Sequence, residues 1–281
     1  MLAITLKGVV SQLTDPPFTI EIVVVDNDKM RSAEEMVQQY AEMGPYKIIY
    51  DCEPEQSIPL ARNRTIRNAN GNFVATIDDD EFPSADWLSK MYRCLKAYDA
   101  DGVLGPVLPH FPSGAPEWLK KSGLCDRPRN PTGSLIMPGR TGNALFKRQI
   151  FEENDMWFDP KMALSGGSDG EFLDRQIEKD RIFVWCDEAI VFETVVEERW
   201  KAQFYLRRHF RIGALMGENN RRFVRTWAVF KNFALLSYYA ALLPLFSIAG
   251  KHNSMKILTK IYYNAGSILS FFSLIHEQPK E

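Results

Sequence analysis

The sequence lacks the features that mark disulfide-rich, zinc-binding and nucleic-acid-binding proteins. Its four cysteines lie far apart in 281 residues, without a CxxC pair or a cluster with histidine. This spacing argues against a structural zinc site and favours a reducing, cytoplasmic compartment. The formal net charge is -2, whereas a general nucleic-acid binder normally carries a basic excess. The N-terminal residues show no cleavage site after a long apolar run, so we expect no signal peptide.

What the sequence does contain is an alternation of apolar β-branched runs and helical patterns. Hydrophobic residues make up 45% of the chain, which is enough for a sizeable core. Ser32 and Glu35 have the spacing of a capping box at the start of a helix. The alternation of strand and helix is typical of a parallel α/β sheet. Strands are predicted at 20–25, 47–51 and 73–77, and helices at 32–43 and 60–69.

Acidic residues follow two of the predicted strands at their carboxyl ends. Asp26 comes after the first strand, and the acidic run DDDE at 78–81 comes after the third. Ligands of parallel α/β sheets bind beyond these strand ends, so we expect the two acidic positions to meet at one cleft. Carboxylates repel one another, and such a run is costly unless a cation such as Mg²⁺ or Mn²⁺ occupies it. The alternative is a solvated acidic turn that caps the helix predicted at 84–98.

Two further polar positions are candidates for chemistry. Arg62 lies in the predicted helix before the acidic run, where its guanidinium can pair with a diphosphate or with Asp78. The alternative for Arg62 is an exposed charge on a helix. Asp169 lies in the segment GGSDGEF at 166–172, where the glycines permit a tight turn beside a ligand. The alternative for Asp169 is to cap the helix that begins there.

The C-terminal part combines a basic segment with two apolar runs. Residues 232–250 and 261–275 contain no charged residue, and the 19 residues of the first run barely reach the length of a membrane span. Basic residues before and between the runs favour a re-entrant or surface-lying hairpin on the inner face of a membrane. The alternative is a buried helical pair. The arginines before the runs are Arg207, Arg208, Arg211, Arg221, Arg222 and Arg225.

Four segments occur in a characteristic order along the chain. They are VVVDND, LARNRTIRNANGNFVATIDDDEFP, TGNALFKRQIF and GGSDGEFLDR. Taken together they resemble the family-2 glycosyltransferases, and within them bacterial members of the succinoglycan-biosynthesis type. The resemblance covers residues 1–213 and implies a GT-A fold, an α/β domain with a mostly parallel sheet flanked by helices. Residues 214–281 are then expected to form an apolar, helical and membrane-associated region.

The resemblance implies an inverting transfer of a sugar from a nucleotide-diphosphate sugar, most often a UDP-sugar, to an acceptor hydroxyl. It implies Mn²⁺ or Mg²⁺ as the cofactor and a saccharide or lipid-linked molecule as the acceptor. Asp26 matches the aspartate that contacts the nucleotide base, and Arg62 matches an arginine near the donor. Asp78 matches a position near the ribose and Asp80 matches the metal ligand, with Asp79 between them in the donor site.

Asp169 matches the catalytic base of the family, although Ser168 precedes it where the family usually has a glutamate. Many members also carry a histidine metal ligand after the strand that follows the base. In this sequence the region holds Glu193, and the nearest downstream histidine is His209. We expect Glu193 to pair with an arginine in preference to completing the metal shell.

Family members normally open with a strand and a nucleotide-binding loop that this sequence does not show. We therefore expect the first strand to be missing from the middle of the sheet. Two other functions stay open, the first because of the missing strand and the second because nucleotidyltransferases also use acidic metal sites beside a parallel sheet. One is a binding protein at the membrane surface that keeps the fold without turnover, and the other is a nucleotidyltransferase. The intact acidic run and Asp169 favour the glycosyltransferase.

Overall fold

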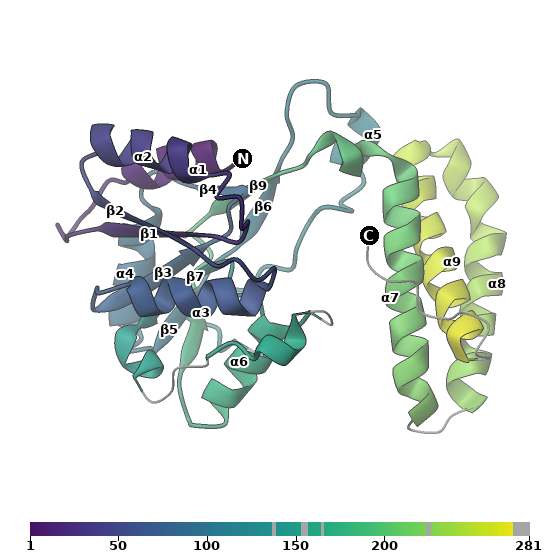
Figure 1. Cartoon of the computed structure of the whole chain (residues 1–281). Helices are drawn as coiled ribbons and strands as arrows, with labels where there is room; N and C mark the ends of the chain where they lie inside the picture. The colour runs from purple at the N-terminus through teal and green to yellow at the C-terminus, as the bar shows by residue number, and fades with distance from the viewer. Residues whose placement is uncertain (137–138, 153–156, 164–165, 223–225, 272–281) are drawn as a thin grey trace. The chain divides into compact units, whose positions relative to one another are not determined.

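The chain folds into two compact units, which are described separately. The computed structural model describes residues 1–136, 139–152, 157–163, 166–222 and 226–271. Unit 1 comprises Met1–Leu108 and Arg127–Glu193 and contains the central β-sheet (Figure 1). Unit 2 comprises Pro109–Asp126 and Thr194–Glu281 and is mainly helical in its described residues.

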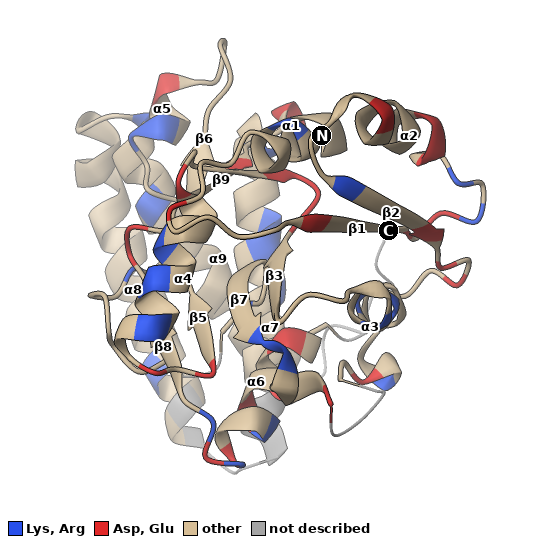
Figure 2. Ribbon diagram, turned by 90° about the vertical axis from the view of Figure 1, so that its left-hand side faces the viewer, with Lys and Arg blue, Asp and Glu red and all other residues tan. Residues whose placement is uncertain are grey.

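The N-terminal part of unit 1 is a two-stranded sheet between two layers of helices. Strands β1 (Glu21–Asp26) and β2 (Lys47–Cys52) pair in parallel along their whole length. Helices α1 (Leu2–Val10) and α2 (Glu34–Met43) cover one face, and α3 (Ile58–Asn68) lies on the other (Figures 1 and 2). The buried apolar side chains between α1, α2 and the sheet are Leu6, Val9, Ile22 and Val37.

The central sheet of unit 1 is mixed rather than mostly parallel. Its strand order is β3-β7-β5-β8, in which β7 is antiparallel to both of its neighbours while β5 and β8 are parallel. The long connection before β7 returns the chain to the middle of the sheet from the opposite end, which reverses that strand. The bounds are β3 (Phe73–Ile77), β5 (Gly102–Leu104), β7 (Asn143–Lys147) and β8 (Phe183–Trp185).

Two helices cover the two faces of this sheet. Side chains alternate between the faces along a strand, so successive residues of β7 enter different cores. Leu145 packs with α4 (Trp87–Ala97), whereas Phe146 packs with α6 (Ser168–Ile177). The core beside α6 is aromatic, with Phe146 and Phe172 in edge-to-face contact at 5.8 Å between ring centroids. This packing fixes α6, and with it Asp169, relative to the sheet.

A third, three-stranded sheet begins directly after the acidic run. Its order is β4-β9-β6, with β4 (Glu81–Pro83), β9 (Val191–Thr194) and β6 (Val107–His110). Strands β4 and β9 are antiparallel and place Glu81 opposite Glu193. In the part of the chain that the structure describes, β1 and β3 belong to separate sheets.

Unit 2 contains three long helices, α7 (Ala202–Arg222), α8 (Thr226–Ile248) and α9 (Lys251–Phe271), and the short α5 (Glu117–Lys120). Helix α9 packs against both α7 and α8. Glycines on α7 and α9 let the two backbones approach closely, as in many membrane helix pairs. A Cβ atom at Gly266 would lie only 2.1 Å from the carbonyl oxygen of Phe210.

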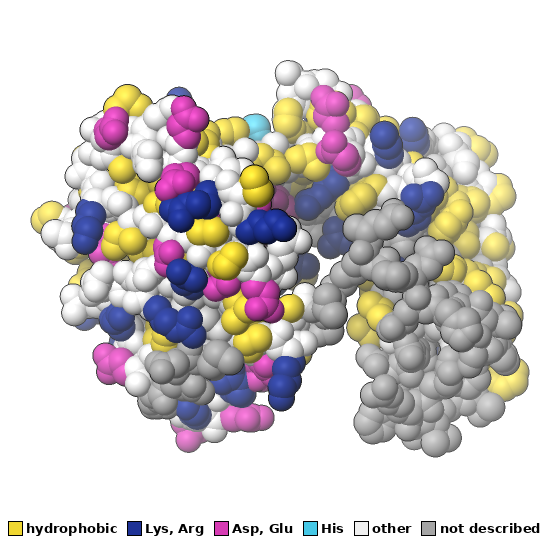
Figure 3. Space-filling model, in the orientation of Figure 1, with side chains coloured by type: hydrophobic (Ala, Val, Ile, Leu, Met, Phe, Trp, Pro, Cys, Tyr) yellow, Lys and Arg dark blue, Asp and Glu magenta, His cyan; other side chains and the backbone are white. Residues whose placement is uncertain are grey.

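Helix α8 differs from an ordinary core helix. Its segment Val229–Ile248 is long and apolar enough to cross a membrane, with a mean hydropathy of 1.4, yet only 6% of it is buried. Apolar side chains lie on all sides of the helix, and Figure 3 shows yellow apolar surface on the visible face of unit 2. The two predicted apolar helices are present, with residues 272–275 of the second run outside the described residues.

The compact units do not divide at residue 213, where the sequence resemblance ends. Helix α7 passes through this position without a break, and Gly213 packs there against the backbone of Tyr263 in α9. Of the six arginines predicted to face a membrane, Arg207, Arg208 and Arg211 belong to the first turns of α7. The side chains of the other three lie outside the described part of the chain.

Candidate active site

Arg62 joins the acidic run to the segment that carries Asp169. Its Nη2 atom lies 3.3 Å from Oδ1 of Asp78, and its Nη1 atom contacts Oδ1 of Asp169 closely. The guanidinium also lies 5.5 Å from the ring centroid of Phe158. Arg62 comes from α3, Asp78 from the end of β3 and Asp169 from the start of α6. The fold therefore brings together three of the residues that the sequence predicts for the site.

Asp169 occupies the second position of α6, after two glycines with left-handed backbone. Gly166 and Gly167 have φ angles of +72° and +90°, which residues with a side chain rarely adopt. Gly167 is the N-cap of α6 and no side chain caps the helix. The Asp169 carboxylate instead accepts a hydrogen bond of 2.7 Å from the hydroxyl of Thr141 and pairs with Arg62. Its contacts are therefore those of a site residue and not those of a helix cap.

The loop before β7 lines the site between Asp78 and Asp169. Thr141 is buried and reaches Asp169, while Gly142 lies directly against Asp78. A Cβ atom at Gly142 would lie 2.7 Å from Oδ2 of Asp78, so only glycine fits without a shift. Loss of hydration is the main cause that raises the pKa of Asp78, and Arg62 opposes this effect. The TGN segment is thus part of the site.

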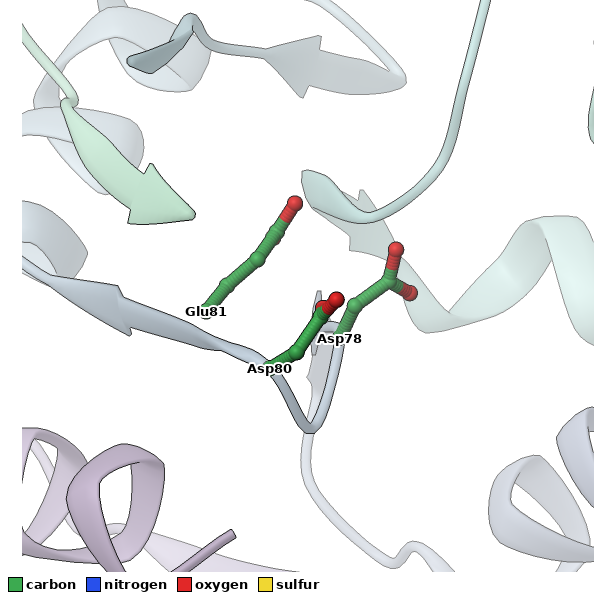
Figure 4. A group of neighbouring side chains, drawn as sticks. All are labelled: Asp78, Asp80 and Glu81. Carbon is green, nitrogen blue, oxygen red and sulfur yellow. The ribbon is translucent and has the colours of Figure 1, made fainter. Parts of the chain in front are cut away.

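The acidic run forms a compact group of carboxylates. Oxygen atoms of Asp78, Asp80 and Glu81 lie within 4.8 Å of one another, and Figure 4 shows the three side chains around one space. The side chain of Asp79 is exposed. Thr5 of α1 holds the turn by donating a hydrogen bond of 2.9 Å to the carbonyl oxygen of Asp79. Carboxylate oxygens are hard ligands that suit Mg²⁺ or Mn²⁺, so the residues of the acidic run fit the implied cofactor.

Glu81 makes the solvated-turn interpretation of the acidic run inadequate. Its side chain is 1% exposed, and its Oε2 atom has no hydrogen-bond partner among the described residues. Burial is the main cause that raises the pKa of Glu81 to about 8. The Nη1 atom of Arg127 lies 3.7 Å from Oε1 of Glu81, and Nη2 of the same arginine makes a close ion pair with Glu193. The predicted pairing of Glu193 with an arginine is confirmed.

Asp26 lies at the end of β1, as predicted, and organises the loop that leads to α2. It accepts hydrogen bonds from the backbone N–H groups of Asp28 (3.0 Å) and Ala33 (2.9 Å) and from the hydroxyl of Tyr50 (3.0 Å). Burial, followed by this bond to Asp26, raises the pKa of Tyr50 to about 12. Contact of Asp26 with a nucleotide base stays a prediction.

The two residues after Arg62 hold the site in place. Asn63 is fully buried and forms two hydrogen bonds with the backbone of Phe158, at 2.8 and 2.9 Å. Arg64 binds Asp51 at the end of β2 through two hydrogen bonds of 2.6 and 3.0 Å. Asn63 and Arg64 therefore tie α3 to two other parts of unit 1, while Arg62 faces the acids.

Sequence reasoning missed several residues of the site. Thr141 and Gly142 lie in a segment that carried the family resemblance, and their position just before a strand was the available sign. Glu81 was predicted as part of the acidic run, without a role of its own. Arg127 lies in a long loop rich in proline and glycine, and nothing local in the sequence marks it. His209 belongs to α7 of unit 2, where its Nδ1 atom lies 2.8 Å from the carbonyl oxygen of Tyr205.

The chain is similar in sequence to known proteins. Residues 1–155 match the family described as Glycosyl transferase family 2. The chain is 31% identical over 216 residues to the succinoglycan biosynthesis protein ExoM of Rhizobium meliloti (strain 1021), which covers 77% of this chain and 70% of ExoM. It is 25% identical over 162 residues to the glycosyltransferase AglE of Haloferax volcanii, covering 58% of this chain and 52% of that protein.

Solved structures show the same fold. The crystal structure of S. aureus TarS 1-349 superimposes with a TM-score of 0.56 at 15% identity, covering 99% of this chain and 89% of that one. The same fragment in complex with UDP-GlcNAc gives a TM-score of 0.55 at 16% identity, covering 96% and 85%. GalNAc-T7 with UDP, GalNAc and Mn²⁺ gives 0.53 at 14% identity, covering 70% and 42%. At such identities the likeness establishes the GT-A fold.

Proposed function

The chain belongs to glycosyltransferase family 2, and we propose that it transfers a sugar from a UDP-sugar to an acceptor hydroxyl with inversion at the sugar carbon. The name of the similar ExoM protein supports a role in polysaccharide or glycolipid biosynthesis. Complexes of GT-A proteins with UDP-GlcNAc and with UDP and Mn²⁺ support the donor class and the cofactor. An inverting transfer needs one base and no covalent intermediate, which suits a site with Asp169 as the base.

The observation that carries this proposal is the bridge that Arg62 forms between Asp78 and Asp169. One guanidinium thus lies beside Asp78, a proposed donor-binding acid, and beside the proposed base. Phosphate groups are strong bidentate partners of arginine, so the diphosphate of a bound donor would compete with both carboxylates for Arg62. Withdrawal of Arg62 leaves the Asp169 carboxylate able to accept the proton of the acceptor hydroxyl.

Other residues of the chain position these groups. The hydrogen bond from Thr141 and the ion pair of Arg62 both go to Oδ1 of Asp169. We therefore assign to Oδ2, the other oxygen, the role of accepting the proton of the acceptor hydroxyl. Asp26 would hold the nucleotide base, and Asp78 and Asp79 would lie along the rest of the nucleoside. Asp80 would hold Mn²⁺ or Mg²⁺, which when bound offsets the negative charge that develops on the leaving nucleoside diphosphate.

Unit 2 would bring the enzyme to its acceptor at the inner face of the cytoplasmic membrane. The exposed apolar helix α8 supports insertion into lipid. A groove of about 760 Å³ on the same unit supports contact with anionic headgroups, because five of its lining residues are cationic. The lining residues are Glu198, Arg199, Lys201, Gln203, Phe204, Arg207, Arg208 and Arg211.

Replacement of the base tests the function directly. Asp169→Asn keeps the shape of the side chain but removes its proton affinity. We expect turnover of UDP-sugars to fall by roughly 10²–10⁴-fold while UDP binding by calorimetry persists. Asp174→Asn changes an exposed aspartate on the same helix and should leave turnover unchanged. Near wild-type turnover of Asp169→Asn, or a product that retains the donor's anomeric configuration by NMR, would contradict the proposal.

A further inference from the structure

Glu81 is the most constrained ionisable side chain of the site. It is the first residue of β4, and its side chain is 1% exposed although it lies next to Asp80 in the sequence. The single hydroxyl hydrogen of Thr5 is shared between the backbone carbonyl oxygens of Asp79 and Glu81, which holds the start of the strand. Its Oε2 atom has no hydrogen-bond partner among the described residues. The carboxylate lies within 4.8 Å of oxygens of Asp78 and Asp80, around the space shown in Figure 4.

Burial of a carboxylate costs free energy unless positive charge and hydrogen bonds replace its lost hydration. The neighbouring Arg127 does this only in part for Glu81. Arg127 approaches Glu81 to 3.7 Å, but its closer ion pair is with Glu193. A buried charge is normally paired and hydrogen-bonded on all sides. Each of the two arginines serves two acidic residues: Arg62 pairs with Asp78 and Asp169, and Arg127 with Glu81 and Glu193.

We propose that Glu81 is a further protein ligand of the divalent cation that Asp80 holds, and that Arg127 keeps Glu193 from this role. The inference rests on the proposed function, because it presupposes a cation at the acidic run. The cation would then contact Oε2 of Glu81, the atom that has no hydrogen-bond partner among the described residues. The antiparallel register places Glu193 opposite Glu81, so Arg127 neutralises one member of the pair and leaves the other for the metal. Hard divalent cations accept several carboxylate oxygens at once.

The test measures Mn²⁺ binding by the full-length protein, not sugar transfer. Free Mn²⁺ is followed by electron paramagnetic resonance during titration, with and without saturating UDP. Glu81→Gln has the same shape and should weaken Mn²⁺ binding by about tenfold or more, since affinity follows the number of charged ligands. Glu81→Asp keeps the charge but withdraws the oxygens, and it should also weaken binding. Because it retains the charge near Arg127, this second variant decides the question if Glu81→Gln does not fold.

Glu193→Gln is the matched control. Glu193 pairs with the same arginine and lies opposite Glu81 in the strand pair. Its replacement therefore measures how far the loss of one nearby negative charge alone weakens Mn²⁺ binding. We expect its loss of Mn²⁺ affinity to be less than about threefold, because the ion pair with Arg127 already neutralises Glu193 and no metal ligand is removed. Equal losses for Glu81→Gln and Glu193→Gln, or unchanged binding by Glu81→Asp, would overturn the inference.

The proposed function fails in a different way. A wild-type protein that binds no Mn²⁺, or an Asp80→Asn variant that binds it as tightly as the wild type, would refute a cation at the acidic run altogether. Binding that depends on Asp80 and not on Glu81 would refute the present inference alone.

Discussion

At the scale of single residues, Asn63 links two segments of the site that lie 95 positions apart. Its amide donates to the carbonyl oxygen of Phe158 and accepts from the N–H group of the same residue. Phe158 in turn packs under the Arg62 guanidinium and against Phe172 of α6. A single buried side chain therefore sets the distance between α3 and the segment that leads to Asp169.

Removal of this amide should destabilise unit 1. Asn63→Ala leaves a buried N–H and a buried carbonyl group without partners, and each unsatisfied group costs about 1–3 kcal/mol. We expect the free energy of unfolding, measured with urea, to fall by about 2–4 kcal/mol. Asn70→Ala is the control. Asn70 also precedes β3 but is exposed, so its replacement should change the free energy of unfolding far less. Equal stability of Asn63→Ala and the wild type would show that the two bonds contribute nothing.

Asp51 gives a pH dependence with a definite sign. Its hydrogen bonds from Arg64 are the main cause that lowers its pKa from 3.8 to about 2. A carboxylate with a lower pKa in the folded state stabilises the fold above its unfolded pKa, and this contribution disappears as the pH falls through the folded pKa. Between about pH 4 and pH 2 the wild type should therefore lose stability more steeply than Asp51→Asn. Urea titrations at several pH values measure the slopes.

Arg64→Gln removes the other partner of the Arg64–Asp51 ion pair. It should therefore reduce the dependence of unfolding free energy on pH in the acid range as much as Asp51→Asn does. Identical slopes for the wild type and both variants would show that the pair does not contribute to acid stability.

The single residues also show how far the sequence could go. Arg62, Asp78 and Asp169 were predicted because each lies in a short segment whose chemistry is visible locally. The role of Glu81 depends on burial, and burial depends on strand β9, more than a hundred positions further along the chain. Arg127 is part of the site only because a long loop returns to β9. Such residues carry no local pattern that separates them from other surface charges.

At the scale of elements, the packing of α7 on α9 depends on residues without a side chain. A Cβ atom at Gly266 would lie 2.1 Å from a carbonyl oxygen of α7, and backbone atoms cannot move aside as a flexible side chain can. Gly266→Ala should lower the thermal unfolding temperature of the full chain in detergent, at a cost of about 1–3 kcal/mol. Gly170→Ala in α6, where no atom lies within 4 Å of the added carbon, should be neutral or stabilising. An equal response of both variants would contradict the close packing.

The bounds of helices and strands were predicted well where the hydrophobic periodicity is strong. They were predicted poorly where a contact with a residue outside the helix determines where the helix begins. Strand β3 has the predicted bounds, and α3 differs from the prediction by two residues at its start and one at its end. The capping box of Ser32 and Glu35 is wrong, because α2 begins at Glu34 without a side-chain cap. Asp26 instead accepts a hydrogen bond from the backbone of Ala33 just before this helix. This hydrogen bond to Asp26, which lies in β1 and outside the helix, thus takes the place of the predicted local cap.

At the scale of the whole molecule, the sequence predicted the class of fold but not its strand directions. The βαβαβ pattern leads to parallel pairing, and β1 and β2 follow it. Strand β7 enters the central sheet in the opposite direction, after a connection whose length and composition do not define its path. The order of strands is a property of long-range pairing, which periodicity along the chain does not contain.

The last prediction concerns unit 2 and the membrane. Helix α8 has apolar side chains on all sides and exposes Trp227 by 70%, Phe230 by 68% and Leu245 by 64%. A helix of this kind is stable in water only if something covers it, and lipid is the covering that suits the cationic groove on the same unit. The full chain should therefore float with vesicles that contain anionic lipid and should bind neutral vesicles more weakly.

Two sets of substitutions separate the apolar contribution from the electrostatic one. Replacing Arg207, Arg208 and Arg211 by alanine should weaken binding to anionic vesicles by roughly 100-fold, since each basic residue near the surface contributes about 1 kcal/mol. Their replacement should leave binding to neutral vesicles unchanged. Phe230→Asp with Leu245→Asp should weaken binding to both kinds of vesicle, because charged side chains oppose insertion into lipid. If the wild-type chain stayed at the bottom of the gradient with both kinds of vesicle, the apolar helix would have to be covered by protein. Recruitment to a membrane would then have no part in the reaction.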